Sequence, residues 1–524
     1  MSESVNSESA PRNAPVTSGR DAILAVLLGV VFVVSLLSMP AVRYDGDVIA
    51  WEMEAESLVY RGTLEVRASV AESLPPSAPY FVFNPDSGKW YSKYGIANTW
   101  IYAIPIAAER FIFGGRPPDS PTSIFGKPTG PFEITRRVEL FNGFNLLLTL
   151  LLATVLYQLA NHFTPRRATA AVFVLACLYS TYLWHYSRAQ SSQIYQVLLF
   201  SAAFLYLVRC VEEARKDAKV KPRTLLCCVL SLALLCAVKT VFLPFIAIFG
   251  IAIALAGWDG AASPISHFTS NVRNNFTTYV RCGVVPLLIL LAVLLWINNL
   301  KFGSPTNMGY ERETNLFGGS LANSLPAYLF SPRFSIFIHF PMLAIALLGM
   351  RGFWKRHRFE FVVAWALFLT MFFIYANYTY WTGEASYGTR YLLFGLPVVS
   401  LPALIVFDRL RTLEPSWLRI IVTASVIAVL LAGSAAQVMV NRLEFHAFFR
   451  LRHQFRLTDD RDPELWNYLR STNTATFNRE FIEYGNGGAE PLPMQRVKRV
   501  ASAERYANLE AAVRAHLSSN HYFW

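Results

Sequence analysis

The sequence carries little charge for its length, and its cysteines avoid the polar segments. Only 16% of the 524 residues are Asp, Glu, Lys or Arg, whereas about a quarter would be usual in a soluble domain. The six cysteines lie in or beside apolar runs; they are Cys177, Cys210, Cys227, Cys228, Cys236 and Cys282. Disulfides are therefore not expected to hold the polar segments together, and no Cys-x-x-Cys pair or His cluster predicts a zinc site.

The motifs of common soluble enzymes are also missing. Gly126-Lys127 is followed by Pro128, so the sequence has no Gly-x-x-x-x-Gly-Lys-Ser/Thr loop for a nucleotide phosphate. Neither His-Glu-x-x-His nor Gly-x-Ser-x-Gly occurs. These absences argue against a P-loop enzyme, a zinc protease of that type and an α/β-hydrolase.

What the sequence has instead is long apolar runs, since 54% of its residues are hydrophobic. Most runs have the roughly 20 residues that cross a bilayer as a helix. The candidate spans are 22–40, 138–160, 168–184, 194–211, 224–238, 241–256, 283–300, 335–350, 360–377, 392–407 and 419–439. The sequence thus predicts an all-α polytopic membrane protein with about eleven transmembrane helices. The first run exceeds a signal-peptide core, so we expect a retained anchor.

Residues 94–113 are apolar but contain Asn98, Pro105, Glu109 and Arg110. Whether this segment crosses the membrane can be judged from the distribution of Lys and Arg between the two sides. If this segment does not span and the N-terminus is cytoplasmic, the short cytoplasmic segments hold eighteen Lys and Arg residues and the short outer loops hold six. Cytoplasmic loops are normally the basic ones, so we place 94–113 as an interfacial or re-entrant helix on the outer surface. The formal charge of +12 then favours the cytoplasmic membrane face as partner, and no nucleic acid.

This topology divides the chain into three parts. Residues 1–20 are predicted to be a disordered cytoplasmic N-terminus. Residues 21–439 form a transmembrane catalytic domain, whose first outer loop, 41–137, contains juxtamembrane helices. Residues 440–524 form a small extramembrane tail on the outer side.

The first outer loop opens with two carboxylates, Asp45 and Asp47, directly after the first span. A solvated Asp-Gly turn would explain them, and so would a general base or metal ligand at the membrane boundary. The stretch 47–62 is predicted to be a helix on the membrane, ended by Gly62. Its glutamates, Glu52, Glu54 and Glu56, are expected to lie partly in water.

Basic residues recur at the outer ends of the predicted spans. The candidates for binding a phosphate are Lys93, Lys239, Arg390, Arg333 and Lys89. Interfacial anchoring or snorkelling would also explain lysines at such positions. Glu384, Tyr387 and Tyr94 are candidates for contact with an acceptor or a sugar, and His185 and Arg188 are weaker candidates in another outer turn.

Taken in order, several short motifs give a resemblance to a known family. They are Asp47 with Trp51 and Gly62, then Lys93-Tyr94-Gly95, Val238-Lys239-Thr240, Ser331-Pro332-Arg333 and Gly388-Thr389-Arg390-Tyr391. Over residues 20–410 this pattern resembles the GT-C superfamily of polyprenyl-phosphate-sugar-dependent glycosyltransferases, in the branch of protein O-mannosyltransferases and lipid A aminoarabinose transferases. Val48 stands where an Asp-Glu pair is common, which weakens the transfer of a metal role to Asp47.

The resemblance implies an inverting transfer of a sugar from a polyprenyl-phosphate donor to a lipid, glycan or protein acceptor. Asp47 would be the catalytic base, with Asp45 as second choice, and Lys93, Lys239 and Arg390 would bind the donor phosphate. No cofactor is predicted firmly, and a divalent metal ion at Asp47 stays open. The expected location is the inner (plasma) membrane of a bacterium, with the C-terminus in the periplasm. The alternative is a polytopic transporter or flippase of a lipid-linked or small polar substrate.

Overall fold

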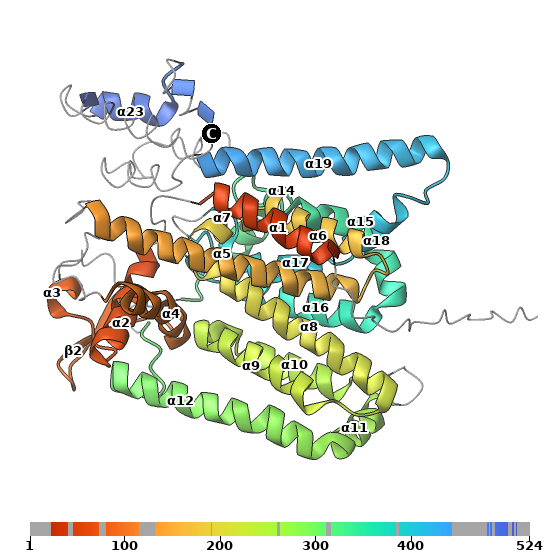
Figure 1. Ribbon diagram of the computed structural model, residues 1–524, viewed down its shortest axis with the longest axis horizontal. Helices are drawn as coiled ribbons and strands as arrows, with labels where there is room; N and C mark the ends of the chain where they lie inside the picture. The colour runs from red at the N-terminus through yellow and green to blue at the C-terminus, as the bar shows by residue number, and fades with distance from the viewer. Residues whose placement is uncertain are drawn as a thin grey trace, which may run out of the picture.

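The computed structural model describes most of the chain between residues 22 and 442. The described residues are 22–39, 46–72, 80–114, 131–189, 191–258, 263–310, 316–383 and 387–442, with short pieces at 479–480, 483–484, 488–500, 506–507 and 510. They fold into a bundle of helices with one small sheet (Figure 1). Asp45 and Glu384, two of the predicted site residues, lie outside this part.

Five helical stretches are long and apolar enough to cross a bilayer. They are Glu139–Asn161 in α5 (Pro131–Asn161), α8 (Gln193–Asp217), the continuous stretch Pro264–Phe302, α16 (Arg358–Ala376) and Ser416–Asn441 in α19 (Ser416–Arg442). A pair bent by 44°, Arg390–Val399 and Ala403–Arg409, would make a sixth. These stretches support an integral membrane protein, whereas the predicted number of about eleven spans is not confirmed.

Further apolar helices are shorter than a full span. They are α1 (Ala22–Leu37), α6 (Arg167–Tyr179), α9 (Pro222–Val238) and the pair η1 (Thr240–Phe242) and α10 (Pro244–Ala254). The remaining elements are α7 (Leu183–Arg188), α11 (Pro264–Tyr279), η2 (Val280–Val284), α12 (Val285–Phe302), α13 (Leu321–Phe330), α14 (Ile336–His339), α15 (Pro341–Arg356), η3 (Arg390–Gly395), α17 (Leu396–Val399), α18 (Ala403–Arg409) and α23 (Leu492–Val500).

The first long loop folds at one end of the bundle (Figure 1). It contains α2 (Gly46–Arg61), α3 (Ala68–Ala71), α4 (Ile96–Phe113) and an antiparallel hairpin of β1 (Phe81–Asn84) and β2 (Lys89–Ser92). The all-α prediction did not include this hairpin. Residues within the turn stabilise it. Asn84 Oδ1 accepts a hydrogen bond from the Asp86 amide at 2.9 Å, and Gly88 adopts a φ of 66°, a conformation that suits glycine.

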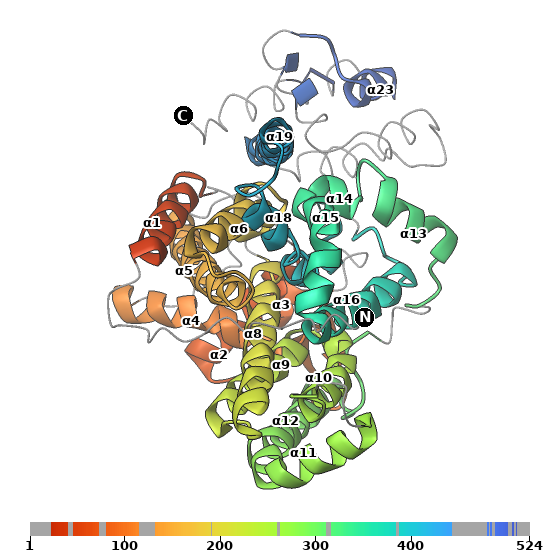
Figure 2. The same ribbon diagram turned by 90° about the vertical axis from the view of Figure 1, so that its right-hand side faces the viewer.

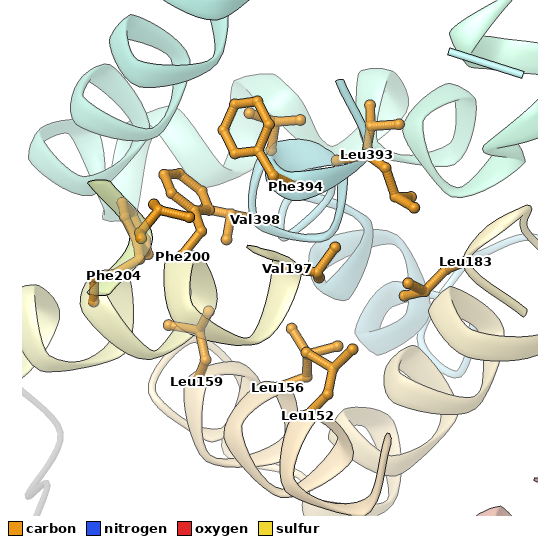
Figure 3. Packing of buried hydrophobic residues seen from close by; sticks show 14 of the residues in the cluster. Leu152, Leu156, Leu159, Leu183, Val197, Phe200, Phe204, Leu393, Phe394 and Val398 are labelled. Carbon is orange, nitrogen blue, oxygen red and sulfur yellow. The ribbon is translucent and has the colours of Figure 1, made fainter. Parts of the chain in front are cut away.

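The centre of the bundle is α8, of whose apolar window 72% is buried. Figure 3 shows side chains from α5, α8, η3 and α17 pointing toward one another. The labelled ones include Leu152, Leu156, Leu159, Val197, Phe200, Phe204, Phe394 and Val398. The leucines of α5 and the apolar residues of α8 recur every three or four positions, so each set lies on one helix face.

The helices α12 and α19 flank the bundle on opposite sides (Figures 1 and 2). Only 6% of the apolar window of each is buried, and Leu288, Ile289 and Trp296 of α12 are exposed. Helices that are apolar all round and unburied by protein suit a lipid surrounding.

The residues from Pro264 to the predicted span 283–300 are helical too, because α11, η2 and α12 form one continuous stretch from Pro264 to Phe302. Two asparagines hold α11 against the ends of other helices. Asn271 Nδ2 donates to Ala254 O at 2.9 Å, and Asn275 Oδ1 accepts the Val220 amide at 3.0 Å.

The segment 94–113 forms α4, which is not among the helices apolar enough to cross a bilayer. In Figure 2 the view runs nearly along α19, and α4 extends sideways. Its placement on the outer surface of the membrane stays a prediction. α8 begins beside α4, where the Tyr195 hydroxyl donates to Asn98 Oδ1 at 2.5 Å, and ends at Asp217, about 36 Å farther along a 25-residue helix.

Candidate active site

The Asp47 carboxylate lies in the first turn of α2, between a hydroxyl and a guanidinium. The Tyr94 hydroxyl donates to Asp47 Oδ1 at 2.5 Å, and Arg390 Nη1 is 3.8 Å from Asp47 Oδ2. The side chains of Asp47 and Arg390 are 27% and 18% exposed. The carboxylate is therefore oriented by two neighbours and still reachable from outside.

One helical turn after Asp47, Trp51 fixes this face of α2. Its buried ring makes edge-to-face contacts with Tyr94 at 5.6 Å and Tyr102 at 5.5 Å between centroids. Residues i and i+4 lie on the same face of a helix, so the side that carries Asp47 is the side docked on α4. The packing of Trp51 thus brings Asp47 to the Tyr94 hydroxyl.

A close backbone contact joins the segment before α4 to the end of α9. A Cβ added at Gly95 would lie 2.5 Å from Ala237 O and 2.6 Å from Val238 O. Asn98 Nδ2 donates to the same Val238 carbonyl at 3.0 Å. Because Val238 directly precedes Lys239, this contact sets Lys239 beside the residues around Tyr94.

Three basic side chains at this end lie over tyrosine rings. Lys239 Nζ is 5.2 Å and Arg390 Cζ is 5.0 Å from the centroid of Tyr391. Lys93 Nζ is 5.5 Å from the centroid of Tyr94 and 5.3 Å from that of Tyr310. These distances fit cation–π contacts.

We call the following set the central cluster: Asp47, Lys93, Tyr94, Lys239, Arg390 and Tyr391. Its members come from α2, the start of α4, the end of α9 and the start of η3, and each contacts another member directly. The structure therefore brings together five predicted site residues that are far apart in sequence. Tyr391 was quoted only as part of a motif, and its stacking on Tyr375 at 4.6 Å was not foreseen.

Buried side chains support the loop that carries Arg390. The Tyr387 side chain is buried, and its hydroxyl accepts a hydrogen bond from Gln437 Nε2 at 3.0 Å. The Tyr182 hydroxyl donates to Thr389 O at 3.0 Å. Burial raises the pKa of Tyr387, and the bond from Gln437 opposes that shift. The predicted contact of Tyr387 with an acceptor or sugar stays a prediction.

Lys89 and Arg333 lie near other partners. Lys89 begins β2, and its Nζ is 3.0 Å from Oε2 of Glu65, which lies between α2 and α3; the Lys89 side chain is 45% exposed. The hydrogen bond from Lys89 to Glu65 raises the pKa of Lys89. Arg333 Cζ lies 5.1 Å from the Phe334 ring, which packs on Trp381. The phosphate-binding roles of Lys89 and Arg333 stay predictions.

The glutamates of α2 do not lie partly in water, as the sequence pattern suggested. Glu52, Glu54 and Glu56 are buried, with exposed fractions of 0%, 0% and 8%. α2 packs against α4 and β2, so the prediction that these glutamates lie partly in water was wrong. Burial raises the pKa of Glu54, and the charge of Lys301 opposes that shift.

Sequence reasoning also missed the partner of Glu54. Lys301 Nζ, at the end of α12, is 2.9 Å from Glu54 Oε1, and both side chains are at most 1% exposed. Glu54 follows Asp47 by seven residues, which places both on one helix face. That spacing was the available signal; Lys301 itself had been counted only as an outer-loop charge.

The described residues around Asp47 do not by themselves form a metal site. Within the part of the chain that the structure describes, no three His, Cys, Asp or Glu side chains gather as a metal site would need. The neighbours of the Asp47 carboxylate include a tyrosine hydroxyl and a guanidinium, and a divalent ion at Asp47 stays a prediction left open. A guanidinium repels a second cation, whereas a divalent ion favours several oxygen ligands.

Comparisons with known proteins give structural similarities only. No family model matches the chain, and no curated protein matches it. The chain is similar to ArnT from Cupriavidus metallidurans bound to undecaprenyl phosphate, with 11% identity over 96% of this chain and 77% of ArnT and a TM-score of 0.47. Against ArnT in the apo state the identity is 13%, over 96% and 73% of the two chains, with a TM-score of 0.49.

The chain is also similar to the oligosaccharyltransferase AglB from Archaeoglobus fulgidus in complex with an inhibitory peptide and a dolichol-phosphate. There the identity is 9% over 88% of this chain and 59% of AglB, with a TM-score of 0.45. One of these structures thus holds undecaprenyl phosphate and another holds a dolichol-phosphate. Because these TM-scores are below 0.5, the geometry of the central cluster has to carry any conclusion about function.

Proposed function

We propose that this protein is an inverting glycosyltransferase that moves a sugar from a polyprenyl-phosphate donor to an acceptor at the outer face of the membrane. The convergence of one carboxylate with three basic side chains in the central cluster carries the proposal. A lipid-linked phosphate needs positive charge at the depth of the headgroup, and an acceptor hydroxyl or amine needs a base.

Four members of the central cluster act directly in this reaction. The acceptor oxygen or nitrogen attacks the anomeric carbon of the donor sugar while Asp47 takes its proton. The bond from the anomeric carbon to the phosphate oxygen breaks, and the electron pair leaves with the lipid phosphate. Lys93, Lys239 and Arg390 stabilise the added negative charge, which is worth most where water is partly excluded.

In the starting state Arg390 lies beside Asp47, and Tyr94 holds the other carboxylate oxygen. A donor phosphate would draw the guanidinium away from Asp47, because two phosphate oxygens can bind an Arg side chain bidentately. The carboxylate would then face the acceptor. Attack from the side opposite the leaving phosphate inverts the anomeric centre.

The membrane supplies the rest of the proposed site. The polyprenyl tail would lie along apolar helices such as α12, whose side chains are exposed. The excess of basic residues in the predicted cytoplasmic loops supports a non-cytoplasmic position of the central cluster, in a bacterium the periplasmic side of the inner membrane. The sugar and the class of acceptor, whether lipid, glycan or protein, are left to the assay below.

A transporter or flippase is the second candidate, and one observation favours it. The stretch that begins at Arg390 is a helix pair bent by 44°, and broken helices are typical of transporter binding sites. In a transporter, labelled substrate would cross the bilayer without release of its lipid phosphate.

The test uses the full-length protein in liposomes, with undecaprenyl-phosphate-linked hexoses and pentoses and a bacterial membrane extract as source of acceptors. We expect labelled product and free undecaprenyl phosphate. Asp47→Asn should lower kcat/KM about 1,000-fold, as for loss of a general base. The control is Asp86→Asn, an exposed carboxylate on the nearby hairpin turn, which should stay within twofold. Full transfer by Asp47→Asn, or transport without transfer, would refute the proposal.

A further inference from the structure

We infer that the buried pair of Glu54 and Lys301 positions the catalytic base, by fixing Tyr94 against Asp47. This inference rests on the proposed function. It assigns a role to two residues that no motif of the sequence singled out. Neither of them would touch substrate, so both are positioning residues.

The contacts of Lys301 connect the pair to Tyr94. Besides its 2.9 Å contact with Glu54 Oε1 and a 3.2 Å hydrogen bond to Glu54 Oε2, Lys301 Nζ donates to the Tyr94 backbone carbonyl at 3.1 Å. The Tyr94 side chain then donates to Asp47 Oδ1 at 2.5 Å. Two short hydrogen bonds, through one residue, therefore separate the buried ammonium from the proposed base.

Glu54 closes this chain of contacts from the other direction. It lies on α2 with Asp47, and its Oε2 accepts a hydrogen bond from Thr99 Oγ1 of α4 at 2.5 Å. Lys301 belongs to α12. The pair thus joins α2, α4 and α12. Glu54 fixes the helix that carries Asp47, and Lys301 fixes the backbone of Tyr94, so the pair sets the distance between Asp47 and Tyr94.

Other contacts hold the end of α12 close to the backbone of Lys93 and Tyr94. Asn84 Nδ2 donates to Leu300 O at 3.1 Å. Gly309 adopts a φ of +79°, and a Cβ added there would lie 2.8 Å from Lys93 O. The apolar window of α12 is only 6% buried, and the two buried side chains of this helix, Ile297 and Lys301, both lie in its last two turns.

The burial of the pair argues that it does more than hold helices together. Removing two charges from water is costly, and an apolar pair of similar volume often stabilises a protein as well or better. An ammonium can do what an apolar side chain cannot: it donates to Glu54 and to the Tyr94 carbonyl at once. A small displacement of the hydroxyl would misplace Asp47, and a shift of about 1 Å at a reacting group can cost about 100-fold in rate.

The test compares two double variants in the full-length protein. Glu54→Gln with Lys301→Met neutralises the pair, and Glu360→Gln with Arg215→Met makes the same chemical changes in the pair at the far end of α8, where Arg215 Nη1 lies 2.7 Å from Glu360 Oε1. We expect the first double variant to lose about 30- to 100-fold in kcat, with the donor KM within threefold. The second should keep kcat within twofold.

Backbone hydrogen exchange at residues 92–99 gives a readout that needs no activity. It should become faster in the Glu54/Lys301 variant and stay unchanged in the Arg215/Glu360 variant. If the double variant does not fold, Thr99→Val removes one hydrogen bond to Glu54 with little change of shape; we expect a loss of about fivefold in kcat and an unchanged donor KM.

The inference is overturned if the folded Glu54/Lys301 variant keeps kcat within twofold, or if both double variants lose kcat equally. A wild-type protein that transfers no sugar from any donor, but whose 92–99 segment loosens only in the Glu54/Lys301 variant, refutes the proposed function and leaves the link to Tyr94 standing. Unchanged exchange at 92–99 refutes the link.

Discussion

Basic side chains make different contacts at the two ends of the helical bundle. At the end where α8 finishes, acids and bases of neighbouring helices pair directly. Arg215 Nη1 is 2.7 Å from Glu360 Oε1, and Arg166 Nη1 is 3.6 Å from Asp408 Oδ1. Thr164 also donates to Asp408, at 2.8 Å. Such contacts connect one helix to the next.

At the end that carries Asp47, three basic side chains of the central cluster lie over tyrosine rings, although ion pairs such as Lys301 with Glu54 occur there as well. Lys239 and Arg390 share the ring of Tyr391, and Lys93 lies over Tyr94 and Tyr310. A cation–π contact contributes about 0.5 to 2 kcal/mol and leaves N–H donors of the cation able to bind an anion. Under the proposed function, the ring-held cations of the central cluster bind the donor phosphate, whereas Arg215 and Arg166 stabilise the fold through their acidic partners.

The largest effect expected from this comparison is loss of Arg390. Arg390→Met should lower kcat/KM about 100- to 1,000-fold, as for removal of one donor that stabilises transition-state charge. Arg166→Met removes the same group at the other end and should change kcat/KM less than twofold, with some loss of thermal stability. Equal losses of activity in a steady-state assay would break the comparison.

Next in size is a change that adds one methyl group at the joint between α4 and α9. Gly95→Ala would place a Cβ 2.5 Å from Ala237 O, which moves Lys93 and Lys239 apart. We expect about 100-fold lower kcat and a lower Tm. The control is Gly143→Ala in α5, where an added Cβ meets nothing within 4 Å. A Gly95→Ala protein with wild-type kcat would contradict the close approach.

Lys93 and Lys89 lie at the same end, but Lys93 lies over tyrosine rings and Lys89 pairs with a glutamate, so the two lysines can be compared directly. Lys93→Met should lower donor kcat/KM about tenfold to 100-fold. Lys89, which pairs with Glu65 at 3.0 Å, should behave like the pairs at the far end, and Lys89→Met should stay within threefold. If Lys89→Met lowered kcat/KM more than Lys93→Met in the same donor titration, Lys89 rather than Lys93 would be the lysine that binds the donor.

The smallest effect concerns the stability of the Lys89–Glu65 pair at high pH. The hydrogen bond to Glu65 raises the pKa of Lys89 above its ordinary value of 10.5. The pair therefore stabilises the fold fully below pH 10.5 and loses that contribution as pH rises through the higher folded value. Glu65→Gln should lower the Tm by about 1 °C or less at pH 8 and by nothing once Lys89 is deprotonated. A difference that grows with pH would contradict this sign.

The residues of the central cluster could largely be found from the sequence, because their motifs stand next to apolar runs. Asp47, Lys93, Lys239 and Arg390 each follow or precede such a run, and the structure brings them together. Tyr391 as a shared ring could not be found, since cation–π partners are chosen by packing between distant segments. The central helices could also be predicted from apolar length.

Two kinds of feature were beyond the sequence pattern. The Glu54–Lys301 pair joins residues 247 positions apart, and nothing local marks Lys301 as the partner of a buried glutamate. The number of spans is the other. Helices such as α6 and α10 are apolar but shorter than a full span, and whether a short apolar helix crosses a bilayer depends on tilt and on neighbours.

The contact at Gly95 carries a consequence for finding relatives of this chain. Any protein that builds the same joint must keep a residue without a side chain at this point, because even one carbon would meet two carbonyl oxygens. Overall similarity is a poor guide for a chain made largely of interchangeable apolar residues. A short signature, with a carboxylate after the first apolar run, a Lys-Tyr-Gly entry some 45 residues on and a lysine in a central helical turn, would select such relatives by the geometry they have to preserve.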